Sequence, residues 1–201
     1  MKIFLISYNL PELSEKKELL RHSTFTFLVD GISRACSHQL VRHRPASYSQ
    51  QSQRYVSMKN FPYVEPESLK GKRVVIDGKE HSFKDIMEFI GKAYEEFVEA
   101  GAPKEDARFV LPNACATRIV FTMNGEELVH FLRLRTCTRA QWEIREMAIE
   151  MLKLLRRNFL ELFGSVGPNC YYLGYCTEGK KSCGRPQEVR EYFRKLEVTD
   201  V

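Results

Sequence analysis

The residues best suited to chemistry lie together in one polar segment, which runs from Gln39 to Tyr55 and reads QLVRHRPASYSQQSQRY. It holds three arginines, one histidine, three serines and four glutamines. Guanidinium groups bind phosphate oxygens through paired donors, hydroxyls add neutral donors, and an amide both donates and accepts, which suits a ring such as uracil. No acidic residue lies between Asp30 and Glu65. The segment therefore predicts a site for a phosphorylated ligand, although a solvated basic loop would have the same composition.

The order of residues within this segment is more specific than its composition. Arg42-His43-Arg44 is followed after seven residues by Ser52, with Arg54 behind it. This RHR-x7-S pattern resembles the signature of the flavin-dependent thymidylate synthases. The resemblance extends from about residue 22 to residue 150, through blocks in matching order: His22-x2-Phe25-Thr26-Phe27, Ala107-Arg108-x2-Leu111-Pro112, Thr122-Met123-Asn124, Phe131-Leu132-x-Leu134-Arg135 and Ala140-Gln141-Trp142-Glu143-Ile144.

The resemblance implies roles for individual residues. The residues expected to bind FAD are Arg42, His43, Arg44, Gln50, Asn124, Glu126 and His130. Those expected to bind dUMP are Gln39, Arg42, Gln50, Gln51, Ser52, Gln53, Arg54, Arg108 and Arg135, with Arg108 reaching the nucleotide from another subunit.

The implied reaction is the reductive methylation of dUMP to dTMP, with methylenetetrahydrofolate as carbon donor, FAD as hydride carrier and NADPH as reductant. Arg135 is the expected catalytic residue. A cation beside the pyrimidine stabilises the negative charge that spreads from N3 to C5, so that C5 attacks the methylene without an enzyme nucleophile. The cofactor carries the redox chemistry and the protein orients it.

Three places depart from the family pattern. A Ser or Thr that contacts FAD in the family is replaced here within Lys16-Lys17-Glu18, and Arg21 stands where an acid usually precedes His22. An aromatic residue or a His often follows four residues after Arg135, where this chain has Arg139. One flavin contact is therefore absent from its usual place.

The pattern of expected helices and strands predicts an α+β fold, in which an antiparallel sheet is packed with long helices. We expect a single domain over residues 1–201, with a helical part. No dinucleotide-binding or phosphate-loop glycine motif is present. The tail over residues 165–201 has no role that we assign. The expected strands are residues 2–7, 24–29 and 116–123, and the expected helices are residues 14–21, 33–41, 83–100, 126–134, 140–163 and 187–196.

Several local features follow from turn and cap chemistry. Ser14 is the expected N-cap of the first helix, Gly31 is expected to end the strand before it, and Asn124-Gly125 is expected to form a turn. The polar run over residues 46–56 is expected to be a loop. Phe131 and Trp142 are expected in the core.

Charge and cysteine content limit the other possibilities. The net charge of +5 is mild, so we expect no nucleic acid partner, and no apolar run is long enough for a membrane span, so we expect a cytoplasmic protein with no membrane partner. The six cysteines form no CxxC pair and are expected to be reduced. Cys170, Cys176 and Cys183 crowd the tail, but their spacing is poor for zinc and no His is near, so we expect no metal.

Two other functions share part of this pattern. A flavin-dependent methyltransferase could act on another uracil, such as one in RNA, and a non-catalytic RNA-binding module could use the three arginines of the segment on phosphates. For the enzyme, so much ligand surface on 201 residues predicts a homotetramer with sites between subunits.

Overall fold

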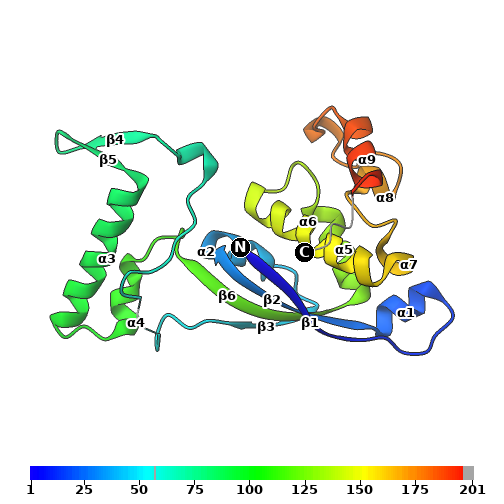
Figure 1. Ribbon diagram of the computed structural model, residues 1–201, viewed down its shortest axis with the longest axis horizontal. Coiled ribbons are helices and arrows are strands. Elements are labelled where there is room, and N and C mark those ends of the chain that lie inside the picture. Colours follow the sequence, from blue (N-terminus) through cyan, green and yellow to red (C-terminus); the bar gives the residue numbers. More distant parts are fainter. Residues whose placement is uncertain (57, 197–201) are drawn as a thin grey trace. The chain divides into compact units, whose positions relative to one another are not determined.

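The computed structural model describes residues 1–56 and 58–196 and divides into two compact units (Figure 1). The first unit comprises Met1–Val29, Gln39–Tyr48 and the chain from Val120 onward. The second comprises Asp30–His38 and Ser49–Ile119.

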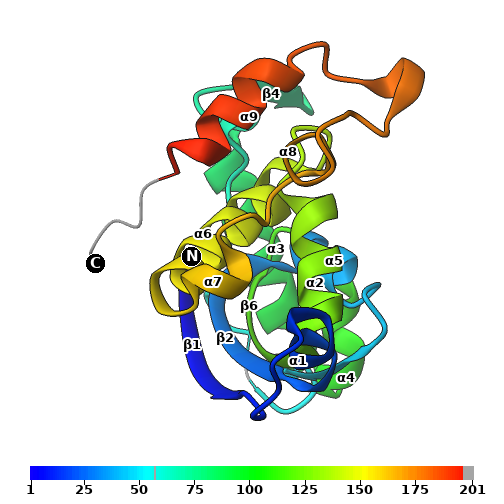
Figure 2. The ribbon, with the colours of Figure 1, turned by 90° about the vertical axis from the view of Figure 1, so that its right-hand side faces the viewer.

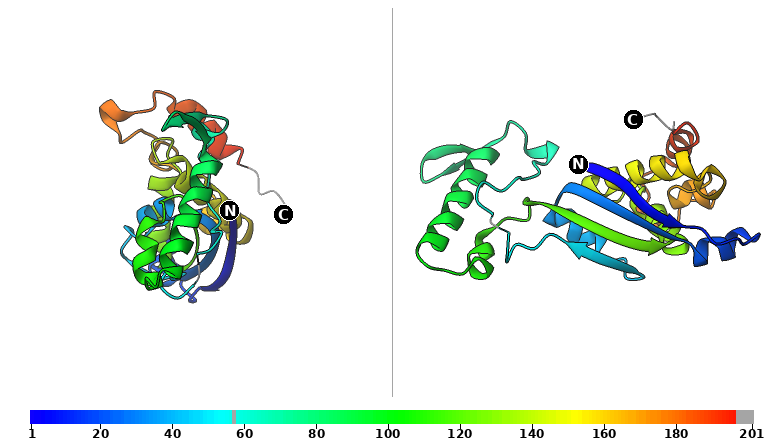
Figure 3. Two further views of the ribbon diagram at one scale, coloured as in Figure 1. Left: turned by 90° about the vertical axis from the view of Figure 1, so that its left-hand side faces the viewer. Right: turned by 60° about the horizontal axis from the view of Figure 1, so that its bottom comes forward.

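A four-stranded sheet is the central element of the fold, and its strands lie side by side in Figure 3. The strand order is β1 (Lys2–Asn9), β2 (Thr24–Ser33), β6 (Ala116–Asn124) and β3 (Ala46–Gln50). The side chains of Thr26 and Thr122 are 2.9 Å apart, and those of Asp30 and Arg118 are also 2.9 Å apart. Residue numbers thus rise on β2 as they fall on β6, so this pair is antiparallel. The predicted α+β class with an antiparallel sheet is confirmed.

Alternation of buried and exposed residues explains β2. Phe25, Phe27 and Val29 are fully buried while the residues between them are only partly covered. The ring of Phe27 stacks on that of Phe121 on β6, with centroids 5.6 Å apart. The prediction that Gly31 ends this strand is wrong. Gly31 adopts a φ of 80°, which a glycine tolerates, and the strand continues through it to Ser33.

The polar run predicted as a loop begins with a strand. Ala46–Gln50 forms β3, in which half-buried and exposed residues alternate. Its polar side chains find partners on neighbouring elements, since Gln50 Nε2 lies 3.3 Å from Thr117 Oγ1 on β6. Hydrogen bonding therefore replaces the apolar burial that a strand prediction relies on.

The first unit carries most of the helices. They are α1 (Lys16–His22), α5 (Gly125–Arg135), α6 (Trp142–Asn158), α7 (Leu160–Phe163), α8 (Asn169–Tyr172), the short 3-10 turn η3 (Gly179–Lys181) and α9 (Pro186–Arg194). The helix predicted over residues 140–163 is split at Phe159, whose φ of −143° is not helical.

The side chain of Gln141 caps α6 by accepting from two backbone N–H groups. Trp142, at the first position of α6, is 43% exposed, so the prediction that it lies in the core is wrong. Phe131 is fully buried, as predicted.

Gly125 allows α1 to lie against the first turn of α5 (Figure 2). A Cβ at this position would lie 2.5 Å from Ser23 Oγ and 2.7 Å from the carbonyl oxygen of Leu20. Asn124 and Gly125 do not form the predicted turn, because the side chain of Asn124 caps α5 by accepting from the N–H of Glu127 at 2.8 Å. The predicted cap of α1 is also wrong, since this helix begins after Glu15, without a side-chain cap, instead of at Ser14.

The second unit is built around a helix and a hairpin. Its elements are most of α2 (Arg34–Leu40), η1 (Glu67–Leu69), the antiparallel pair β4 (Arg73–Ile76) and β5 (Lys79–Ser82), α3 (Phe83–Glu99), α4 (Lys104–Ala107) and η2 (Arg108–Val110). A capping box between Ser82 and Asp85 starts α3. Met87 and Tyr94 of this helix are buried with Phe61 and Cys115. Within the described residues, no helix has the length and apolar character that a bilayer crossing requires.

Candidate functional site

The Arg42-His43-Arg44 turn follows α2 and is held by Tyr48 of β3. Tyr48 Oη lies 2.6 Å from the carbonyl oxygen of His43. Burial raises the pKa of the Tyr48 phenol, so its hydroxyl remains a donor at neutral pH. His43 is buried, whereas Arg42 and Arg44 on either side are exposed. The turn therefore presents two guanidinium groups to solvent and inserts the imidazole into the protein.

His43 bridges Glu127 and Arg135, which lie on the same helix, α5. Its Nδ1 is 3.1 Å from Glu127 Oε1, and Arg135 Nε is 3.0 Å from its Nε2. Because a guanidinium only donates, Nε2 must accept, and the imidazole proton is on Nδ1, which donates to Glu127. Burial lowers the pKa of His43 against the opposing effect of Glu127, so the ring is neutral at neutral pH.

A hollow of about 810 Å³ lies beside this bridge in the same unit. Three of the residues predicted to bind flavin, Asn124, Glu126 and His130, line it. The rest of the lining was not predicted from the sequence and includes Lys16, Lys17, Leu20, Pro45, Glu127, Val129, Arg133 and Tyr172. Lys16 and Lys17 could have been predicted, because they stand where the family has a Ser or Thr that contacts FAD.

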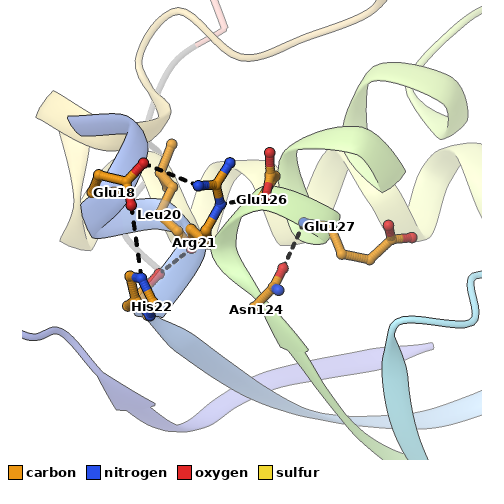
Figure 4. Close-up of polar contacts among 8 residues, drawn as sticks. Glu18, Leu20, Arg21, His22, Asn124, Glu126 and Glu127 are labelled. Carbon is orange, nitrogen blue, oxygen red and sulfur yellow. Dashed lines mark hydrogen bonds and ion pairs between the residues drawn. The ribbon is translucent and has the colours of Figure 1, made fainter. Parts of the chain in front are cut away.

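Arg21 connects α1 to α5 through Glu126, one of the residues that line this hollow (Figure 4). Its guanidinium contacts Glu18 at 3.1 Å and Glu126 at 3.4 Å. The residue that departs from the family pattern at position 21 thus pairs with one of the residues expected to bind the flavin. Since all three side chains are more than 40% exposed, these ion pairs set orientation more than stability.

A second group of predicted residues lies in the second unit and is held by amide hydrogen bonds. Gln50 Nε2 donates to Ser37 Oγ at 2.8 Å, and Arg34 Nη2 donates to Gln53 Oε1 at 3.1 Å. Ser52 Oγ accepts from the backbone N–H of Arg54 at 3.1 Å. The end of β3 and the segment after it are therefore held to α2 by polar side chains.

An acidic residue does reach the basic segment, contrary to what its sequence indicates. Glu105 of α4 lies 2.6 Å from Arg54, and its carbonyl oxygen accepts from Arg108 Nε at 3.0 Å. Glu105 is outside the acid-free stretch of the sequence, but the fold places its carboxylate beside Arg54. It groups two of the arginines predicted to bind dUMP.

The predicted site residues thus divide between the two units. Those of the first unit are Gln39, Arg42, His43, Arg44, Asn124, Glu126, His130 and Arg135, and those of the second are Gln50, Gln51, Ser52, Gln53, Arg54 and Arg108. Gln39 Nε2 lies 3.5 Å from Oε1 of Gln141, the residue that caps α6.

Four cysteines line one small cavity in the first unit. Cys137 joins the three tail cysteines Cys170, Cys176 and Cys183, although only those three were predicted to cluster. A hydrogen bond from Thr138 lowers the pKa of Cys183, whereas burial raises that of Cys170. All of these cysteines are free thiols, and in the part of the chain that the structure describes, no three His, Cys, Asp or Glu residues are arranged to hold a metal ion.

Comparison with known proteins identifies the class of this chain. The family model described as "Thymidylate synthase complementing protein" matches residues 6–159. The chain is 48% identical to a flavin-dependent thymidylate synthase of Geobacter sulfurreducens over 184 residues, which cover 90% of this chain and 77% of that protein. It is 46% identical to one of Pyrococcus abyssi over 189 residues, covering 90% and 76%, and 42% identical to one of Clostridium tetani over 186 residues, covering 87% and 74%.

These matches define an enzyme rather than a non-catalytic binding module. The chain belongs to the family of flavin-dependent thymidylate synthases.

Proposed function

We propose that the chain converts dUMP to dTMP by reductive methylation, with methylenetetrahydrofolate as carbon donor, FAD as hydride carrier and NADPH as reductant. The relatives named above are synthases of this type, which supports the substrate and product. The observation that carries the proposal is the fixed contact of Arg135 with His43, because it orients the one arginine that the resemblance assigns to the uracil.

The first unit has a hollow whose residues fit FAD. Its volume of about 810 Å³ lies in the usual range for ligand pockets, roughly 300–1,000 Å³. Lys16, Lys17 and Arg133 outnumber the two carboxylates of the lining, Glu126 and Glu127, and are the residues that would pair with a diphosphate. Asn124, Glu126 and His130 are the residues that would contact the flavin or its adenosine part, together with Arg42, His43, Arg44 and Gln50. When bound, the flavin supplies the hydride that reduces the transferred methylene to a methyl group, and NADPH restores it.

The residues proposed to hold dUMP combine phosphate donors with amides. Arg54 pairs with the carboxylate of Glu105, Arg108 donates to the backbone carbonyl of the same residue, and Ser52 adds a hydroxyl. Gln50 and Gln53 are already oriented by hydrogen bonds, which reduces the entropy lost on binding. Gln39, Arg42 and Gln51 complete the proposed set.

Arg135 is the proposed catalytic residue. Beside the pyrimidine its charge stabilises the anion that develops as C5 forms a bond to the methylene carbon, after which C5 loses its proton. A neutral His43 supports this role, since it accepts from Arg135 without adding a second positive charge. No enzyme nucleophile is required.

The runner-up function is a flavin-dependent methyltransferase that acts on a uracil in RNA. It would use the same flavin residues, but the net charge of +5 is small for an RNA enzyme and the relatives are named for thymidylate synthesis. The family membership disfavours the non-catalytic RNA-binding module. We further propose a cytoplasmic homotetramer with neither a nucleic acid nor a membrane partner, and without a bound metal.

The deciding experiment measures dTMP formation and tritium release from C5-labelled dUMP, with methylenetetrahydrofolate, FAD and NADPH. Omission of any one component should abolish turnover. Product formation on uracil-containing RNA in place of dUMP would support the runner-up instead. Purified protein that neither binds FAD nor forms dTMP would contradict both.

A further inference from the structure

We propose that Glu127 is a positioning residue, which holds the guanidinium of Arg135 in its working orientation through His43. Neither the resemblance nor the comparisons assign a role to Glu127. The inference rests on the proposed function for the role of Arg135, but the three-residue connection itself is independent of any ligand.

The geometry of α5 creates this connection. Glu127, Phe131 and Arg135 are spaced four residues apart and form a row along the helix. The ring of His43 packs edge-on against Phe131, with centroids 4.9 Å apart, and so lies along this row. One imidazole nitrogen then meets Glu127 at 3.1 Å and the other meets Arg135 at 3.0 Å.

Glu127 is itself held firmly. Its backbone N–H donates to Asn124 in the first turn of α5, where the helix dipole favours a carboxylate. Its side chain is only 12% exposed and that of His43 only 6%. Since water has little access to the pair, their hydrogen bond has a defined geometry.

A carboxylate is the group this position requires. It only accepts, so together with the donor-only guanidinium of Arg135 it fixes the imidazole proton on Nδ1 and leaves Nε2 as the acceptor. An amide at position 127 could turn and donate to Nδ1 instead, which would move the proton to Nε2. Two donors, Nε2–H and the Nε–H of Arg135, would then face each other, and the guanidinium would have to move.

The kinetic test compares three variants, Glu127→Asp, Glu127→Gln and Glu127→Ala, with Glu191→Gln as the matched control. Glu191 pairs with Lys195 on the surface of α9, so its replacement removes a carboxylate from an exposed pair. We expect Glu127→Ala to lower kcat about 10²-fold, the effect of a misplaced catalytic group, with a much smaller loss of FAD affinity, since Glu127 lines the proposed flavin pocket, and with the Kd for dUMP within about twofold of the parent. The control should keep the parent kcat.

The order of the other two variants separates positioning from packing. Gln matches the size of Glu, so a purely structural role predicts that Glu127→Gln is the milder change. Positioning through an acceptor-only group predicts that Glu127→Asp retains the higher kcat. A kcat for Glu127→Gln equal to or above that of Glu127→Asp would overturn the inference.

A second measurement needs neither flavin nor substrate. Protein labelled with ¹⁵N in histidine and arginine should show His43 protonated on Nδ1 and a slowly exchanging Nε–H for Arg135. Both signatures should be lost in Glu127→Ala and kept in Glu191→Gln. If the chain forms no dTMP, the proposed function fails while this result still tests the connection. Finding His43 protonated on Nε2 in the parent would overturn it.

Discussion

Arg54 lies 2.6 Å from Glu105, which follows it by more than fifty residues along the chain. This contact brings an acidic group to a segment whose own sequence has none. A phosphate that approaches Arg54 therefore meets a guanidinium that is already oriented by the Glu105 carboxylate, whose backbone carbonyl accepts from Arg108. Orientation of Arg54 in the free protein would reduce the entropy lost when a phosphate binds, although the Glu105 carboxylate competes with that phosphate for the guanidinium.

We expect Arg54→Ala to weaken dUMP binding at least tenfold, because a charge-assisted contact to phosphate is lost. The measurement is isothermal titration of the FAD-loaded protein with dUMP. Arg118→Ala is the matched control, since Arg118 forms an exposed pair with Asp30 at 2.9 Å in the same unit. Equal losses in both variants would show that net charge, rather than position, governs affinity.

Arg135→Ala should reduce turnover far more than it reduces FAD affinity. Removing one donor to a developing anion costs on the order of 2.7–4 kcal/mol, or 10² to 10³ in rate. Single-turnover dTMP formation and flavin fluorescence titration measure the two effects separately. A variant that converts dUMP at the parent rate would exclude Arg135 as the activating cation.

Activity and stability should both fall as the pH drops below the usual pKa of histidine, about 6.5. Burial lowers the pKa of His43 in the folded state, so in this range the unfolded chain binds more protons and acid favours unfolding. Glu127 opposes this shift, while Arg135 and His130 reinforce it. Protonated His43 also cannot accept from Arg135, so kcat should fall in the same range.

The check is a urea titration at several values from about pH 5 to about pH 7, repeated on His43→Gln. The variant lacks the titrating ring, so its free energy of unfolding should depend less on pH over this range. An identical pH dependence in both proteins would mean that other groups control it.

Gly125→Ala should destabilise the first unit by about 1–3 kcal/mol, the usual cost of overpacking. The new Cβ would lie 2.5 Å from Ser23 Oγ and 2.7 Å from a backbone oxygen of α1. Displacement of α1 should also weaken FAD binding, because Lys16 and Lys17 line the proposed flavin pocket.

Gly91→Ala is the control for this substitution. Gly91 lies inside α3, and its Cβ would be 3.9 Å from Phe61, an ordinary contact. Alanine should therefore stabilise the protein by about 0.4–1 kcal/mol. Thermal denaturation of both variants gives the comparison, and destabilisation of similar size in each would refute the close approach of α1 to α5.

Local sequence signals predicted the apolar strands and the amphipathic helices because burial repeats with the period of each element. Phe25 and Phe27 on β2 follow that pattern. The polar strand β3 could not be predicted this way, since its side chains are satisfied by hydrogen bonds to elements distant in sequence, as Gln50 is by Thr117.

The same limit applies to the candidate site. Family resemblance predicted roles for Arg135 and His43. Their partner Glu127, near the start of α5, is 84 residues from His43 and lies outside the sequence blocks that resemble the family. Likewise, spacing along the tail gave no reason to include Cys137, which lies on the same cavity as the tail cysteines. Contacts between distant segments depend on the tertiary fold, which local patterns do not contain.

The last prediction concerns assembly, for which we expect a homotetramer whose sites combine residues of different subunits. The proposed ligands present a large surface for a chain of 201 residues, and closed symmetry creates pockets at interfaces. Arg54 and Arg108 both contact Glu105, so they belong to one group within a chain. A complementation test must therefore pair Arg108→Ala with Arg135→Ala, which lie in different units.

Each variant alone should be nearly inactive, since every site lacks one of the two arginines. In a mixed oligomer, a site that takes Arg135 from the Arg108→Ala chain and Arg108 from the Arg135→Ala chain contains both wild-type residues, so activity should partly return on mixing. Light scattering should give the mass of four chains, and tagged subunits should verify exchange. Mixing Arg54→Ala with Arg108→Ala is the control, because both residues come from the same group and no complete site can form. A monomeric mass with full activity, or no rescue after verified exchange, would contradict shared sites.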